Sequence, residues 1–144
     1  DNVHLTLHFL GDVEDARVPP LGAALAALDG RPFSLAVEGL GAFPSRRAPR
    51  VLVARTDCPP GLSLLHAQVG AALRGLGHAS ERRPFRPHLT LARLRQADRQ
   101  GVRAFLVQPA PALSFPVEAV HLIRSTLRPE GARYERLHTV RLGS

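Results

Sequence analysis

The sequence predicts an α+β fold built from a duplicated unit, with antiparallel sheets flanking a central cleft and helices outside. The tetrapeptide His-Leu-Thr-Leu occurs twice, at residues 4–7 and 88–91. After each copy the expected order is the same: the motif strand, then a helix and two strands. Residues 33–38 (FSLAVE) are also echoed by residues 113–118 (LSFPVE). A duplicated α+β unit brings both motif strands to one cleft about a pseudo-two-fold axis.

The first half of the chain is expected to contain strands on either side of one helix. Proline suits the first turn of a helix and glycine the residue past its end, which supports a helix between Pro19 and Gly30. The expected elements are a strand over 3–10, a helix from 19 or 20 to 28, a strand over 33–38, an irregular stretch at Gly39, Gly41 and Pro44, and a strand over 50–55.

A long amphipathic helix is expected between the two repeats. Its apolar residues recur at helical spacing, at Leu62, Leu65, Val69, Leu73 and Leu76, between a turn at 58–61 and Gly77. The further expected elements are a strand over 88–94, a short helix over 99–106, and strands over 115–126 and 133–142 that are joined by a turn at 128–131.

The length of 144 residues predicts a single domain over residues 1–144. No apolar run approaches the roughly 20 residues of a membrane span, and the first residues lack a secretory pattern, so we expect no membrane partner. Cys58 stands alone, which excludes an intrachain disulfide and argues against a cysteine-based zinc site. These observations favour a reducing, cytoplasmic location.

The charge favours a nucleic-acid partner. The net charge is +7, and every basic residue is arginine, whose planar fork binds phosphate with two hydrogen bonds. The chain is also rich in Ala, Gly, Pro and Arg together, so a bias in coding composition is the alternative explanation. Arg82, Arg83 and Arg86 cluster just before the second tetrapeptide, and this part of the charge carries more weight.

Each tetrapeptide is expected to present one imidazole and one hydroxyl on the same face of a strand, with leucines behind them. His4 and His88 can then act as a pair, because near a pKa of about 6.5 one imidazole can be neutral and the other protonated. The neutral ring accepts a proton from a nucleophile, and the protonated ring gives one to a leaving oxygen. Thr6 and Thr90 can bind phosphate oxygens, so the pattern fits metal-free displacement at a phosphodiester.

Arg93 is a candidate to neutralise the phosphate, but it lies five residues after His88. An odd spacing places it on the opposite face of a flat strand, so a twist or a bulge is needed to bring it to the site. A single His-x-Thr is typical of an ordinary half-buried strand. Two copies separated by half the chain are stronger evidence for a site.

The other histidines are weaker candidates. On a strand, His8 shares the face of His4, where it either touches substrate or lines the rim. His66 is expected to be a surface or packing residue, and we assign no role to the histidines at 78, 121 and 138. No His-Glu-x-x-His pattern, nucleophile elbow or phosphate loop is present, so neither a metal nor a cofactor is expected.

Four blocks of the chain resemble, in order, those of the 2H phosphoesterase superfamily. They are residues 2–11 (NVHLTLHFLG), 39–44 (GLGAFP), 84–93 (PFRPHLTLAR) and the pattern Ser125-x-Leu127-x-x-x-Gly131-Ala132-x-Tyr134. Within the superfamily the blocks are most similar to those of the RNA 2′,3′-cyclic phosphodiesterases, also called 2′-5′ RNA ligases. A strand and a helix usually precede the first block in that family, and this sequence starts at the block, so we expect these two elements to be missing from it.

The resemblance implies a bilobal α+β fold with a cleft between the lobes. It also implies a hydrolase that converts RNA 2′,3′-cyclic phosphate ends to 2′-phosphomonoesters without a cofactor, and that joins RNA halves through a 2′-5′ linkage. His4 and His88 match the catalytic histidines, and Thr6, Thr90 and Arg93 match phosphate-binding positions. The expected partner is RNA with cyclic phosphate ends, tRNA fragments included, and the expected state is a monomer.

Two alternatives stay open at this point. One is a basic RNA-binding module that has the same fold and does no chemistry. The other concerns the direction of proton transfer: the resemblance favours His4 as the acid on the 3′-oxygen and His88 as the base that activates water, but the residues alone do not decide between the two assignments.

Overall fold

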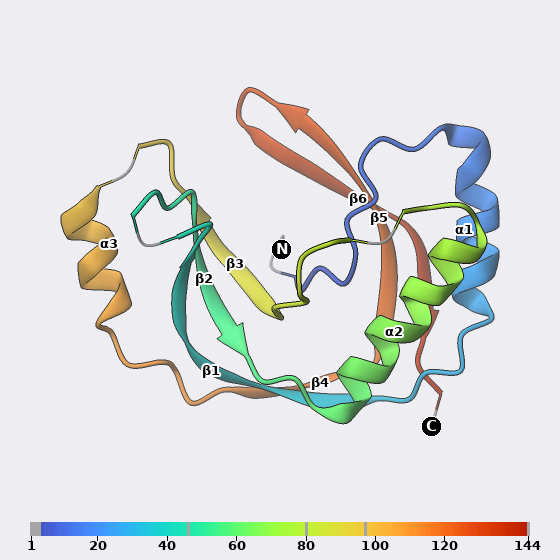
Figure 1. The fold of residues 1–144 in the computed structure, drawn as a ribbon, viewed down its shortest axis with the longest axis horizontal. Helices are drawn as coiled ribbons and strands as arrows, with labels where there is room; N and C mark the ends of the chain where they lie inside the picture. The colour runs from blue at the N-terminus through green and yellow to red at the C-terminus, as the bar shows by residue number, and fades with distance from the viewer. Residues whose placement is uncertain (1–3, 46, 80, 97, 144) are drawn as a thin grey trace. The chain divides into compact units, whose positions relative to one another are not determined.

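The computed structural model describes residues 4–45, 47–79, 81–96 and 98–143, and its helices and antiparallel sheets confirm the α+β class (Figure 1). Within these residues no helix is both long enough and apolar enough to cross a membrane. The elements in chain order are a 3-10 helix at Asp15–Arg17, α1 at Val18–Ala26, β1 at Phe33–Phe43, β2 at Val51–Thr56, α2 at Pro60–Gly75, β3 at His88–Arg93, α3 at Arg99–Leu106, β4 at Ser114–Val117, β5 at Ala119–Arg128 and β6 at Gly131–Arg141.

The chain folds into two compact units, each assembled from three separate segments. The first unit takes the residues up to Leu7, Ser34–Pro59 and Pro84–Phe115. The second unit takes His8–Phe33, Pro60–Arg83 and the residues from Pro116 onward. The units do not coincide with the two halves of the repeated element order, because each draws on both halves. Both copies of His-Leu-Thr-Leu belong to the first unit.

The first unit contains β2, β3 and all of β1 but its first residue, and these strands form a four-stranded sheet with β4 in the order β3-β2-β1-β4. Strand β2 is antiparallel to both of its neighbours. Each of these neighbours carries one extra residue in the ladder, Glu38 in β1 and Leu91 in β3, which no residue of β2 opposes. An extra residue of this kind is a β-bulge, and it reverses the alternation of side chains beyond it.

Strand β1 is longer than expected, and the predicted irregular stretch is wrong at its two glycines. Gly39 pairs with Arg55 and Gly41 pairs with Val53, so the strand continues to Phe43 before Pro44 interrupts the pattern. Glycine is usually unfavourable inside a strand, and it often marks a place where another group approaches closely. The group here is the side chain of Arg55, which lies against both glycines.

The strand expected over residues 3–10 is wrong for most of its length. Among its described residues only Leu5 pairs with the sheet, through one isolated antiparallel bridge to Leu89. The chain bends at Leu7, and from His8 onward it belongs to the second unit. Alternating apolar residues favour a strand only where a partner continues the ladder, and here the ladder stops after one pair.

The second unit packs α1 and α2 with the long hairpin of β5 and β6 (Figure 1). Its core follows the apolar spacing of the two helices, with buried side chains at Leu21, Leu25, Leu62, Leu65, Val69 and Leu73. Gly22 lets α1 approach β6 closely, since an added Cβ would lie 2.6 Å from Nε2 of His138. The expected strand over 115–126 is two strands, because Glu118 separates β4 from β5.

His121 gives the hairpin a pH-dependent stability. It lies on β5 opposite Thr139, whose Oγ1 is 2.9 Å from its Nδ1. Partial burial, then the charges of Arg136 and Arg141, lower the pKa of His121 below its usual 6.5. The unfolded chain therefore binds this proton more readily, and stability falls as the pH drops below 6.5 toward the folded-state pKa.

We expect the free energy of unfolding in urea to fall less in His121→Gln than in the parent chain between about pH 7.5 and about pH 5. The glutamine variant lacks the titrating group, so it loses this contribution to the pH dependence. Parallel urea titrations at the two pH values measure the difference. An equal fall in both proteins would contradict the assignment to His121.

Candidate functional site

The two copies of His-Leu-Thr-Leu lie side by side in the first unit. Leu5 and Leu89 form an antiparallel bridge, so position 4 falls opposite position 90 and position 6 opposite position 88. Because side chains alternate along extended chains, the histidine and threonine of each copy lie on the face away from the bridged leucines. The four polar residues of the two copies therefore share one face of the sheet, and each histidine is next to the threonine of the other copy.

The bulge in β3 brings Arg93 to this same face. Thr90 pairs with Val53 and Ala92 pairs with Leu52, which leaves Leu91 without an opposing residue. Beyond the bulge Arg93 pairs with Val51. Val51 and Val53 are two apart on β2, so Arg93 shares the face of Thr90. The odd spacing in the sequence required such a bulge.

Leu91 was expected to pack on the opposite face of the strand from His88 and Thr90, but it does not. Its side chain is 48% exposed, whereas Leu89 is half-buried. The reason is the bulge, which removes Leu91 from the regular alternation of the strand.

The imidazole of His88 is held from two sides. Its Nδ1 lies 2.6 Å from the carbonyl oxygen of Arg86. A carbonyl oxygen only accepts hydrogen bonds, so Nδ1 carries the proton and donates it. The ring also meets Phe43 edge-on, with 4.7 Å between the ring centroids. In the neutral ring Nε2 is therefore the unprotonated nitrogen, available to accept a proton.

The candidate residues are accessible to a substrate to different degrees. His4, His88 and Thr90 are half-buried, while Thr6 and Arg93 are exposed. In the described part of the chain, no group of three or more His, Cys, Asp or Glu side chains is placed to hold a metal ion. The arrangement offers two imidazoles, two hydroxyls and a guanidinium on one face, which suits proton transfer at an anionic centre.

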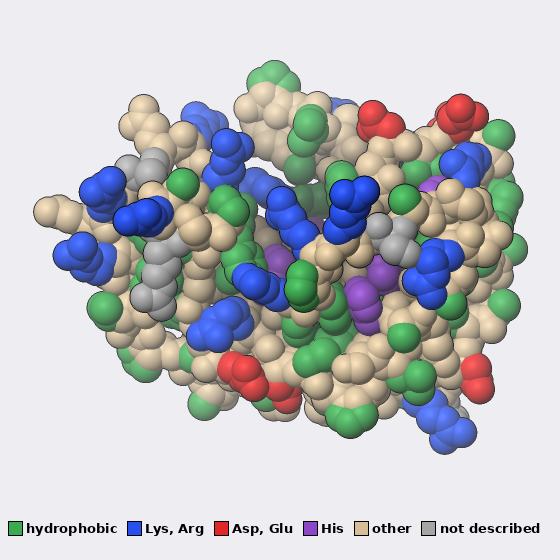
Figure 2. Space-filling view, viewed as in Figure 1, with side chains coloured by type: hydrophobic (Ala, Val, Ile, Leu, Met, Phe, Trp, Pro, Cys, Tyr) green, Lys and Arg blue, Asp and Glu red, His purple; other side chains and the backbone are tan. Residues whose placement is uncertain are grey.

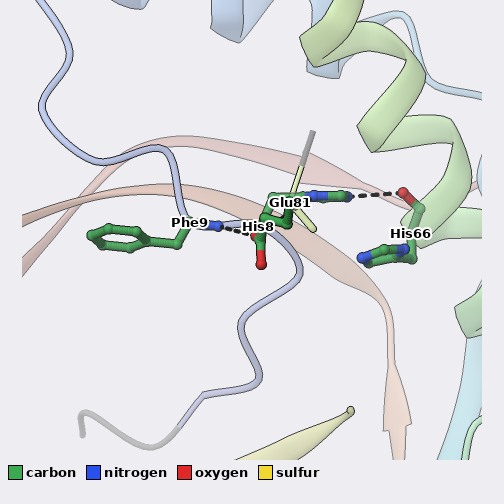
Figure 3. A network of polar contacts seen from close by, with 4 residues as sticks. All are labelled: His8, Phe9, His66 and Glu81. Carbon is green, nitrogen blue, oxygen red and sulfur yellow. Dashed lines mark hydrogen bonds and ion pairs between the residues drawn. The ribbon is translucent and has the colours of Figure 1, made fainter. Parts of the chain in front are cut away.

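His8 does not lie on a strand, contrary to its expected position, because the chain leaves the sheet before it. In the second unit its Nε2 donates to the carbonyl oxygen of His66 at 2.9 Å, and the two rings stack with centroids 4.1 Å apart (Figure 3). Glu81 accepts a hydrogen bond from the backbone N–H of Phe9 at 2.9 Å, and its Oε1 is 3.9 Å from Nδ1 of His8. His8 and His66 are thus packing residues of the second unit.

Two neighbours of His88 were not singled out from the sequence. Phe43 contacts its ring, and Arg55 is its direct cross-strand partner. The sequence shows that Arg55 ends an expected strand, but it contains no indication of which strand lies alongside. Arg82, Arg83 and Arg86 are all exposed, and Figure 2 shows arginine side chains spread over the drawn face.

Comparison with known proteins identifies the family. The family model described as the 2′-5′ RNA ligase superfamily matches residues 2–128. The RNA 2′,3′-cyclic phosphodiesterase of Geobacillus stearothermophilus is 38% identical over 130 residues, which are 88% of this chain and 41% of that protein. A protein of the same name from Aeropyrum pernix is 30% identical over 100% of this chain and 84% of its own length. Another, from Thermus thermophilus, is 36% identical over 92% of this chain and 68% of its own length.

Solved structures share the fold. The crystal structure of TT0787 of Thermus thermophilus superposes with a TM-score of 0.78 at 32% identity, over 97% of this chain and 78% of that one. The crystal structure of Escherichia coli LigT complexed with 3′-AMP gives 0.79 at 27% identity, over 99% and 78%. The family match includes both copies of His-Leu-Thr-Leu, and this chain belongs to the 2′-5′ RNA ligase superfamily.

Proposed function

We propose that this chain hydrolyses the 2′,3′-cyclic phosphate at the end of an RNA strand and leaves a 2′-phosphomonoester. The main support for the proposal is the bridge between Leu5 and Leu89, because it places both histidines and both threonines of the motifs on the same face of one sheet. The names of the Geobacillus, Aeropyrum and Thermus relatives support the substrate. The net charge of +7 supports an RNA partner.

In the proposed mechanism the two histidines exchange protons with the reacting oxygens. Nε2 of His88 accepts a proton from water as the water oxygen bonds to phosphorus. The bond from phosphorus to the 3′-oxygen breaks in line with the attack, and protonated His4 gives its proton to that oxygen. His88 ends protonated and His4 neutral, and exchange with solvent restores the pair. The proton on Nδ1 of His88 supports its role as the base.

The remaining site residues bind the phosphate. The hydroxyls of Thr6 and Thr90 donate to its non-bridging oxygens, and each lies beside the histidine of the other copy. The guanidinium of Arg93 stabilises the charge that grows on these oxygens as water attacks. Joining two RNA halves through a 2′-5′ linkage is the same bond exchange with the 5′-hydroxyl of a second strand in place of water. That oxygen bonds to phosphorus and gives its proton to His88, while the bond from phosphorus to the 3′-oxygen breaks and His4 protonates that oxygen.

We expect the chain to convert cytidine 2′,3′-cyclic phosphate to the 2′-phosphate, with no loss of rate in EDTA. The pH dependence of kcat/KM should be bell-shaped, because one histidine must be neutral and the other protonated. Chromatography identifies the isomer that is formed. Loss of activity in EDTA would contradict the metal-free mechanism. Salt-sensitive RNA binding without turnover would instead support a non-catalytic RNA-binding module.

A further inference from the structure

The face that carries both motifs also carries an arginine that the proposed reaction does not use. Arg55 of β2 lies directly opposite His88 of β3 on one side and Gly39 of β1 on the other. Residues directly opposite each other in an antiparallel pair project to the same face. Arg55 therefore shares the face of the two histidines.

The side chain of Arg55 runs over β1 and away from β3. A Cβ added at Gly39 would overlap its Nη2, and one added at Gly41 would lie 3.5 Å from its Cδ and its Nε. Gly39 and Gly41 thus form a strip of β1 without side chains, called the glycine floor below, and the side chain of Arg55 lies across it. The guanidinium is displaced from β3 by about two inter-strand spacings, roughly 10 Å.

The guanidinium is available to an anion. Arg55 is exposed, and within the described ranges no carboxylate forms an ion pair with it. Among the described residues, the contact that positions the Arg55 side chain is its packing against Gly39 and Gly41, since no ion pair involves it. A guanidinium in this state offers its fork of N–H donors to a phosphate.

We propose that Arg55 binds the phosphodiester on the 5′ side of the terminal nucleoside, so that the site prefers an RNA strand to a mononucleotide. The inference rests on the proposed function, because the cyclic phosphate must sit at the two motifs. The histidines, the threonines and Arg93 are assigned to that cyclic phosphate, and the guanidinium of Arg55, which lies over β1, remains for the next phosphate of the strand. A strand that crosses the sheet from β3 toward β1 brings its next phosphate above the glycine floor, where no side chain of Gly39 or Gly41 blocks the backbone.

The test compares kcat/KM for a dinucleotide that ends in a 2′,3′-cyclic phosphate with kcat/KM for the cyclic mononucleotide. In Arg55→Ala this ratio should fall roughly tenfold, since a hydrogen bond to a charged group is lost only from the longer substrate. The salt dependence for the dinucleotide should weaken by about 0.7 in its logarithmic slope, the value for one phosphate contact on a single strand. Arg31→Ala removes the same charge from an exposed position before β1 and should leave the ratio unchanged.

A second variant tests the glycine floor. Gly39→Ala displaces the guanidinium and should lower the ratio in the parent chain, but it should have no effect in the Arg55→Ala background. An unchanged ratio in Arg55→Ala, or an equal fall for both substrates, would overturn the subsite and leave the proposed function standing. Failure of the parent chain to turn over either substrate would overturn the proposed function and the subsite with it.

Discussion

Replacement of His88 by alanine is expected to lower kcat on an RNA 2′,3′-cyclic phosphate end by about 10²–10⁴, with a much smaller change in KM. The variant has no group at the position of Nε2 to accept the proton from water. His4→Ala should lose a similar factor, because the 3′-oxygen then leaves without a proton. Steady-state kinetics and single-turnover rates measure the chemical step in both variants.

The two histidines should also behave as a unit. The double variant is expected to be only slightly slower than either single variant, since residues that act in one step are strongly non-additive. His121→Gln is the matched control, because it removes an imidazole from the hairpin of the second unit and should keep the parent rate at neutral pH. Full activity in either His4→Ala or His88→Ala would contradict the two-histidine mechanism.

Leu62→Ala is expected to destabilise the second unit by about 2–5 kcal/mol. The side chain of Leu62 is 1% exposed on α2, so the truncation removes buried apolar surface and leaves a cavity. Urea unfolding followed by circular dichroism measures the loss. Leu64→Ala on the same helix is the control, because Leu64 is 58% exposed and its truncation should cost within about 0.5 kcal/mol. Equal losses in the two variants would contradict the core assigned to α2.

The helices were predictable because their patterns are local. The expected helix over 99–106 is confirmed at both ends as α3, and the apolar spacing from Leu62 to Leu73 follows the buried face of α2. The helix predicted to end at Leu28 ends at Ala26. A helical face repeats within a few residues of sequence, so one segment contains the information that its own periodicity needs.

The sheet of the first unit was less predictable, because its partners are far apart in sequence. The strand predicted over 3–10 does not form, because among its described residues only Leu5 has a pairing partner. Strand β1 continues through Gly39 and Gly41 because β2 pairs with both. The repetition of His-Leu-Thr-Leu indicated which residues come together. The orientation of Arg93 and the position of Arg55 depend on a register that the sequence does not encode locally.

Because of the bulge at Leu91, Arg93 shares the face of His88 only if five positions separate the two residues in the sequence. With one residue fewer or one more on the same bulged strand, the guanidinium would point to the reverse side of the sheet, since a shift of one residue exchanges the faces of a strand. The interval of five is thus a criterion for comparing relatives. A relative with its arginine four or six positions after the histidine needs a regular strand there if that arginine is to share the face of the histidine.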